Sequence, residues 1–134
     1  MSEAENKRIV QEFWDAFASG NSEKAFSLMA DDFVWSVIGT TPLSGTYRGK
    51  QQVQEKFLAK VFEVVDAEAG VGLEIEELIA EGEKVVMRAK GSMKGRYGPY
   101  NNSYCHVMTV RDNLLRATVE YVDTALVNSA LYSL

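Results

Sequence analysis

The spacing of apolar residues changes along this 134-residue chain near Gly70. Before that point, apolar side chains recur every three or four residues in residues 5–19, 23–30 and 50–65, which is the period of an amphipathic helix. After it, they alternate with polar residues, which is the period of a half-buried strand. Helices followed by a run of antiparallel strands predict an α+β fold.

The predicted order of elements is helix, helix, strand, helix and then four strands. The first strand is the bulky segment 33–38, and residues 39–49 form a turn-rich loop before the third helix. The last four strands are expected at residues 73–78, 84–93, 100–110 and 114–123, and the apolar tail is expected to dock. A curved sheet wrapped around the helices can enclose a conical cavity, and we expect residues 1–134 to form a single domain.

Charge and composition argue against several classes of partner. The net charge of −5 and the pI of about 4.9 disfavour nucleic acid and anionic membrane surfaces. The N-terminus is acidic and polar, unlike a signal peptide, so a cytoplasmic location is expected. Cys105 and His106 are the only cysteine and the only histidine, so neither an internal disulfide nor a typical zinc site is expected. We expect no metal and no cofactor.

Four short segments carry a resemblance to a known family. In order along the chain they read FWDAFASGN (13–21), ADDFVW (30–35), LSGTYRG (43–49) and EYVD (120–123). Together they resemble the SnoaL-like polyketide cyclase and ketosteroid-isomerase-like branch of the nuclear-transport-factor-like superfamily. The resemblance implies a cystatin-like α+β roll, in which a cone-shaped, mostly antiparallel mixed sheet wraps around N-terminal helices. It also implies a homodimer formed through the outer face of the sheet, where we expect exposed side chains at Val86, Val107, Thr109 and Thr118.

The resemblance does not extend to the catalytic residues of two of the enzyme classes that share this fold. The tyrosine of ketosteroid isomerases falls at Phe13, their base falls near Val37, and their second aspartate falls near Tyr104 or Cys105. Steroid isomerase activity of that type is therefore not expected. Epoxide hydrolases of this fold place an arginine between two aspartates. Here Arg88 lies on a suitable strand, but Lys90 stands where an aspartate is expected.

Asp123 matches the aspartate that polyketide cyclases carry near the end of the last long strand. A carboxylate that enters an apolar cavity loses hydration, which moves its pKa toward the range useful for proton transfer. The alternative is that Asp123 caps the turn at residues 124–125. Strict alternation groups Tyr121 with Asp123, but a β-bulge would turn Glu120 inward instead, so Glu120 is the alternative acid.

His106 and Tyr104 are the other candidate catalytic residues. They alternate with Met108, so all three share one face of a strand. If that face lines the cavity, His106 could carry a proton or orient a ligand, and Tyr104 or Tyr47 could donate a hydrogen bond to an oxyanion. The alternatives are that His106 is a hydrogen-bonded core residue and that the tyrosines only pack.

The expected ligand is a small apolar molecule held by side chains from the helices and the sheet. These residues are Phe13, Trp14, Phe17, Trp35, Val37, Tyr47, Phe57, Met87, Met108 and Tyr121. The favoured hypothesis is a cofactor-independent enzyme in which Asp123 moves a proton on a small carbonyl compound, while Tyr47, Tyr104 or His106 stabilises the enolate. The alternatives are a non-catalytic module that binds a hydrophobic ligand and a dimeric assembly module whose cavity is filled by its own side chains.

Overall fold

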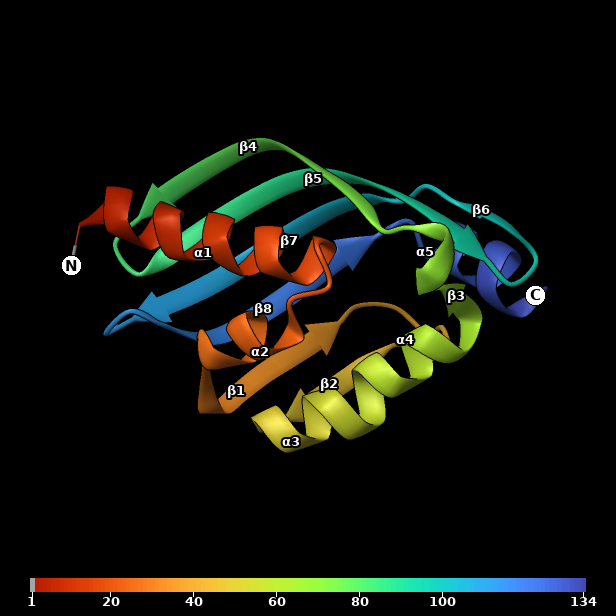
Figure 1. Ribbon diagram of the computed structural model, residues 1–134, viewed down its shortest axis with the longest axis horizontal. Helices are drawn as coiled ribbons and strands as arrows, with labels where there is room; N and C mark the ends of the chain where they lie inside the picture. The colour runs from red at the N-terminus through yellow and green to blue at the C-terminus, as the bar shows by residue number, and fades with distance from the viewer. Residues whose placement is uncertain (1) are drawn as a thin grey trace.

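The computed structural model describes residues 2–134, so Met1 of the predicted domain lies outside the described residues. Figure 1 shows the N-terminal helices packed against a curved sheet, with a further helical run beneath the sheet. The helical elements are α1 (Glu3–Ala18), α2 (Ser22–Ser27), α3 (Lys50–Gln52), the π-helical turn η1 (Val53–Leu58), α4 (Ala59–Val64), the 3₁₀ turn η2 (Ala67–Ala69), α5 (Thr124–Leu126) and the π-helical turn η3 (Val127–Tyr132). No helix in residues 2–134 is long and apolar enough to cross a membrane.

The strands form one curved sheet in which most neighbours are antiparallel. They are β1 (Met29–Val37), β2 (Gly45–Arg48), β3 (Val65–Asp66), β4 (Gly72–Glu81), β5 (Lys84–Gly95), β6 (Gly98–Tyr100), β7 (Ser103–Arg111) and β8 (Leu114–Val122). Their order is β2-β1-β8-β7-β5, and β4, β3 and β6 also pair with β5. The β1–β8 pair is parallel, so the sheet is mixed as expected.

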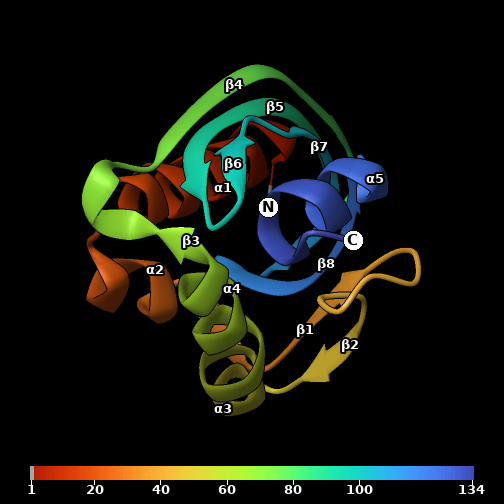
Figure 2. The ribbon, with the colours of Figure 1, turned by 90° about the vertical axis from the view of Figure 1, so that its right-hand side faces the viewer.

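The helices pack inside the curve of the sheet. Figure 2 shows the strands as an arc from β4 through β8 to β1, with α1 and η3 inside the arc. The helix α1 begins at a capping box, because the Ser2 hydroxyl accepts from the Glu5 N–H at 3.1 Å and Glu5 accepts from the Ser2 N–H. Its buried face carries Ile9, Phe13 and Trp14, as the helical spacing predicts. The tail docks as expected, and Leu131 is fully buried.

Several predicted boundaries are wrong for reasons that lie in strand pairing. Helix α2 ends at Ser27 rather than near residue 30, because Met29 already pairs with Leu115 of β8. The predicted loop 39–49 contains β2, a four-residue strand that pairs with β1 and has one buried residue, Tyr47. The predicted strand 100–110 is divided into β6 and β7 by two residues outside the ladders.

A β-bulge in β8 decides which of its residues face the helices. Thr109 of β7 pairs with Ala117, but the next residue, Val110, pairs with Leu115, so Arg116 has no partner in this ladder. The extra residue reverses the alternation, because successive strand side chains point to opposite faces of a sheet. Leu115 points inward before the bulge, and Glu120 points inward after it.

The bulge also corrects two expected orientations. Tyr121 lies on the outer face with 43 % of its surface exposed, so it does not line the cavity. Thr118, expected on the outer face, is buried. Strand β7 has no such irregularity after Tyr104, and its burial pattern confirms that Tyr104, His106 and Met108 share the inner face.

Candidate active site

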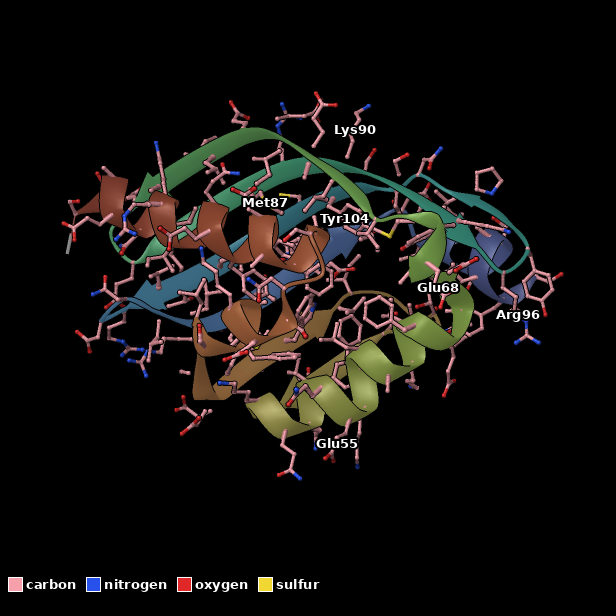
Figure 3. The ribbon with its side chains drawn as sticks, viewed as in Figure 1. Glu55, Glu68, Met87, Lys90, Arg96 and Tyr104 are labelled. Carbon is pink, nitrogen blue, oxygen red and sulfur yellow. The ribbon has the colours of Figure 1, made fainter. Side chains whose placement is uncertain are left out.

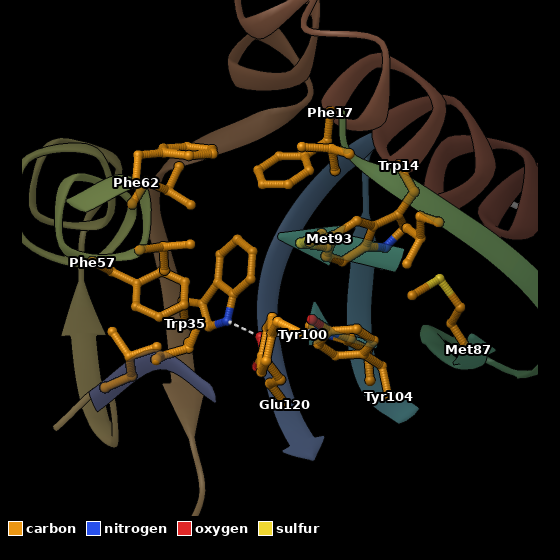
Figure 4. Close-up of a pocket in the computed structure, with 17 residues that line it drawn as sticks. Trp14, Phe17, Trp35, Phe57, Phe62, Met87, Met93, Tyr100, Tyr104 and Glu120 are labelled. Carbon is orange, nitrogen blue, oxygen red and sulfur yellow. Dashed lines mark hydrogen bonds and ion pairs between the residues drawn. The ribbon is translucent and has the colours of Figure 1, made fainter. Parts of the chain in front are cut away.

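A cavity of about 70 Å³ lies between α1, the helical run from η1 to α4, η3 and the inner face of the sheet. Its wall is mostly apolar, and the close-up in Figure 4 shows large side chains on every side. Figure 3 shows Met87 and Tyr104 directed to the interior, whereas Lys90 of the same sheet points away from it. The aromatic lining residues are Trp14, Phe17, Trp35, Phe57, Phe62, Tyr100 and Tyr104.

The two π-helical turns bring apolar side chains to the cavity. Phe57 and Leu58 lie in η1 and line the cavity together with Phe62 from the next turn. Leu131 reaches it from η3. Wide turns of this kind are often found at functional sites, because the inserted residue re-aims the side chains that follow it.

Glu120 is the only carboxylate among the described residues that line the cavity. Its Oε1 accepts a hydrogen bond from the indole N–H of Trp35 at 3.1 Å, and Nε2 of His106 lies 3.5 Å from the same oxygen. Burial raises the pKa of Glu120 to about 7, and the hydrogen bond from Trp35 opposes that rise only in part. The group can therefore gain or lose a proton near neutral pH.

His106 is a neutral neighbour of this carboxylate. Burial lowers its pKa to about 3, because a charged imidazolium would lose its hydration among the rings of Trp14 and Trp35. Its Nδ1 lies 2.8 Å from the Thr118 hydroxyl. When that hydroxyl donates to Nδ1, the ring proton is on Nε2 and faces Glu120. The contact therefore orients the carboxylate and is not an ion pair at neutral pH.

Two tyrosines supply hydroxyl groups to the same end of the cavity. Burial raises the pKa of Tyr100 to about 12 and that of Tyr104 well above its usual value, and the negative charge of Glu120 adds to both rises. Both hydroxyls therefore stay protonated and can donate. The Tyr100 oxygen accepts from the Asn102 amide N–H at 3.2 Å and from the Tyr104 hydroxyl, so Tyr100 can present its own proton to a ligand.

Asp123 lies outside the cavity. Its Oδ1 accepts from the backbone N–H of Leu126 at 3.2 Å and so caps α5, which is the alternative weighed for this residue. Its backbone is held by Asn102, which accepts from the Asp123 N–H at 3.0 Å and donates to its carbonyl at 3.1 Å. This corrects the expectation that Asp123 enters the cavity, and the physical reason is the bulge at Arg116.

The structure brings some of the predicted catalytic and ligand-binding residues together at the cavity and separates others. Those that line it are Trp14, Phe17, Trp35, Phe57, Met87, Tyr104 and His106. Phe13, Val37 and Met108 are buried but lie outside the lining, and Trp14 donates to the Met108 sulfur at 3.3 Å. Tyr47 is also outside it, because its hydroxyl donates to the Leu43 carbonyl at 2.8 Å.

Sequence reasoning missed Tyr100 and treated Glu120 only as an alternative. Tyr100 is an even number of residues away from Tyr104 and His106, so strand alternation alone would have placed all three on one face. Two residues outside the ladders interrupt the strand between Tyr100 and Tyr104. Residues 2–134 contain no cluster of three or more histidine, cysteine, aspartate or glutamate side chains that could hold a metal ion.

Comparison with protein families settles the relationship of this chain to known proteins. A family model described as the SnoaL-like domain matches residues 10–118. The chain belongs to the SnoaL-like domain family. A comparison with curated proteins found no match for this SnoaL-like domain.

Solved structures confirm the predicted fold of the SnoaL-like domain. An NTF2-like protein from Burkholderia xenovorans is 28 % identical, with a TM-score of 0.75 and 98 % of each chain covered. TerC, co-crystallised with polyporic acid, is 24 % identical with a TM-score of 0.81, and 95 % of this chain and 98 % of TerC are covered. An LEH-like epoxide hydrolase from M. tuberculosis is 19 % identical with a TM-score of 0.76, and 98 % of this chain and 92 % of the hydrolase are covered.

Proposed function

We propose that this SnoaL-like domain is a proton-transfer enzyme that acts on a small, largely apolar carbonyl compound with Glu120 as the base. The observation that carries the proposal is a single carboxylate in an apolar cavity, with its pKa raised by burial to about 7. A base whose pKa lies near the working pH combines a useful ionised fraction with a useful proton affinity. Glu120 takes the role first expected of Asp123.

The proposed reaction uses side chains that meet at one end of the cavity. The Glu120 carboxylate removes a proton from the carbon next to the carbonyl, and the C–H electron pair moves into an enolate. The negative charge then resides on the carbonyl oxygen, to which Tyr100 can donate a hydrogen bond while its own oxygen accepts from Tyr104. Return of the proton from Glu120 to the same or another carbon restores a neutral carbonyl compound and an ionised base.

The size of the cavity limits the ligand. A cavity of about 150 Å³ holds benzene, and the space here is about 70 Å³. The part of the substrate that reaches Glu120 is therefore smaller than one aromatic ring, and any larger part would remain at the mouth. Acetone and butanone are suitable first probes, because each is small enough for the cavity and has exchangeable protons next to its carbonyl.

Deuterium exchange tests this proposal without knowledge of the natural substrate. Incorporation of deuterium from D₂O into the two ketones is followed by NMR with wild type, Glu120→Gln and Asp123→Asn. We expect enzyme-dependent exchange that falls by about 10²–10⁴-fold in Glu120→Gln, as is typical for loss of a general base. Asp123→Asn, whose side chain lies outside the cavity, is the matched control and should exchange like wild type. Equal rates for Glu120→Gln and wild type would disprove the role of Glu120.

A second candidate is a non-catalytic module that holds a small hydrophobic ligand. The observation that favours it is the hydrogen bond from Trp35 to Glu120, which gives the carboxyl group a structural partner of its own. In that case the ketones would bind without exchange, and Glu120→Gln would keep its affinity for them. Titration of the quenching of Trp14 and Trp35 fluorescence separates the two candidates, because it reports binding whether or not exchange occurs.

A further inference from the structure

Two aromatic rings reach diagonally across the sheet to strand β8. In the ladders, His106 is the direct partner of Glu120, and Trp35 is the direct partner of Thr118. Each ring contacts the other position on β8. The Nδ1 atom of His106 lies 2.8 Å from the Thr118 hydroxyl, and the indole N–H of Trp35 donates to Oε1 of Glu120 at 3.1 Å, the bond marked in Figure 4. Long side chains reach such diagonal neighbours in a sheet, so the four residues form one connected polar group.

Two nitrogen atoms converge on the same oxygen of Glu120. Its Oε1 accepts from Trp35 and lies 3.5 Å from Nε2 of His106, which is the outer limit for a hydrogen bond. Neither of these two contacts involves Oε2. A hydrogen bond to an ionised oxygen stabilises its charge and weakens it as a base. Oε2 is therefore the oxygen that is left to take a proton from a ligand.

The position of the ring proton of His106 follows from its neighbours. The ring is neutral at physiological pH, so one nitrogen carries a proton and the other carries a lone pair. A lone pair on Nε2 would face the lone pairs of an ionised Glu120, so the proton is on Nε2 when Glu120 is ionised. Nδ1 is then an acceptor, and the Thr118 hydroxyl is its donor. His106 and Thr118 are each 1 % exposed, so solvent does not replace that hydroxyl.

We infer that Thr118 is a positioning residue for the base: its hydroxyl holds the ring of His106 so that Nε2–H faces Oε1 of Glu120 and leaves Oε2 for the substrate. Without the hydroxyl, Nδ1 becomes a buried acceptor with no partner, and the ring loses the contact that fixes its orientation. The ionised carboxylate then keeps only Trp35 as a donor, which raises its pKa further. The catalytic meaning of this inference rests on the proposed function, whereas the arrangement of the three side chains does not.

No charged group other than Glu120 itself lines the described part of the cavity. Tyr104 from β7 and Tyr100 from β6 face the same space, and burial raises the pKa of both, so they are neutral at neutral pH. The lining residues from β1, β4, β5, the helices and the π-helical turns are not titratable. A change in the titration of Glu120 after a substitution of Thr118 therefore reports the contact through His106.

NMR spectroscopy tests the inference without a substrate, because His106 is the only histidine in the chain. Wild type, Thr118→Val and Thr118→Ser are labelled with ¹⁵N in histidine and ¹³C in the glutamate carboxyl groups, and each is titrated with pH. Glu120→Gln assigns the Glu120 signal. We expect wild type at pH 8 to carry the ring proton on Nε2, and its Glu120 to titrate at about pH 7. That midpoint should be about 0.5–1 pH unit higher in Thr118→Val, and Thr118→Ser, which keeps the hydroxyl, should restore the wild-type value.

The two variants of Thr118 separate positioning from packing. Valine keeps the volume of threonine and loses the hydroxyl, whereas serine keeps the hydroxyl and loses a methyl group, so a role in packing alone predicts the larger change in Thr118→Ser. The pH profile of deuterium exchange into acetone should show the same midpoints as the NMR titration. A ring proton on Nδ1 of wild type at pH 8, or equal midpoints for wild type and Thr118→Val, would overturn the inference. Absence of exchange in wild type would contradict the proposed function alone, because the NMR titration needs no turnover.

Discussion

Glu120 and His106 share one apolar environment. Burial raises the pKa of Glu120 and lowers that of His106, and each shift favours the neutral form of the group. The pKa of Glu120 is higher in the folded protein than in the unfolded chain. Its contribution to stability is therefore fully present below about pH 4.5 and is lost as the pH rises through about 7. The pKa of His106 is lowered, so its contribution is present above about 6.5 and is lost as the pH falls toward 3.

Glu120→Gln should remove the first of these pH dependences and leave the second. Between pH 4.5 and pH 8, the free energy of unfolding of wild type should fall relative to that of Glu120→Gln by up to about 3 kcal/mol. Urea denaturation at pH 4.5, 6, 7 and 8 measures the difference. A constant difference between the two proteins across this range would show that the pKa of Glu120 is not raised in the folded state.

Asn102 is the residue that joins Tyr100 to the start of α5. Its buried side chain donates to Tyr100 and to the Asp123 carbonyl, and it accepts from the N–H groups of Ser103 and Asp123. Asn102→Ala should lower the free energy of unfolding by about 2–4 kcal/mol, because it leaves several buried partners unpaired. Asn101→Ala is the control in chemical denaturation. Asn101 is exposed and accepts from Met93 alone, so a loss as large as that of Asn102→Ala would contradict the argument.

At the scale of elements, the position of Tyr104 in β7 depends on a glycine in the neighbouring strand. A Cβ atom at Gly91 of β5 would lie 2.8 Å from a ring carbon of Tyr104, closer than two carbons can approach. The tyrosine ring therefore rests over a backbone position without a side chain, and this places its hydroxyl at the cavity.

Gly91→Ala should displace Tyr104 and lower the free energy of unfolding by about 1–3 kcal/mol, the usual effect of overpacking. The double variant Gly91→Ala with Tyr104→Ala removes the clash. The combined loss should therefore be smaller than the sum of the two single losses in a double-mutant cycle measured by urea denaturation. Additive losses would show that the two residues do not compete for the same space.

At the scale of the whole molecule, the outer face of the sheet carries an apolar row that crosses four strands. Ile79, Val86, Val107 and Val119 are direct partners in successive ladders from β4 to β8. Ile79 is 52 % exposed, and the next row on β5 begins with the charged Arg88. An apolar centre with a charged border is typical of protein interfaces, and we therefore propose that two copies associate through this face.

Val107→Lys should convert a dimer to a monomer, because it places a charge at the centre of the apolar row. Sedimentation equilibrium over a range of protein concentrations measures the change. Glu81→Lys, which alters an exposed residue at the end of β4, is a control for the added positive charge. A wild-type protein that remains monomeric at every concentration would contradict the proposed association.

The sequence by itself determined the elements that depend on local spacing. The period of Ile9, Phe13 and Trp14 identifies α1, and alternation identifies the inner face of β7, because both patterns follow from backbone geometry within one segment. The family could also be recognised, since its four segments lie in order along the chain. Short edge strands such as β2 have too few residues to show a period.

Only the tertiary structure decided which carboxylate enters the cavity. Glu120 and Asp123 are close in sequence, and strict alternation favours Asp123 because it shares parity with Leu115. The extra residue at Arg116 reverses that parity, and it becomes visible only when β8 is paired with β7. The pKa of Glu120 is likewise a tertiary property, since it depends on burial among residues from distant segments, including Trp35 and His106.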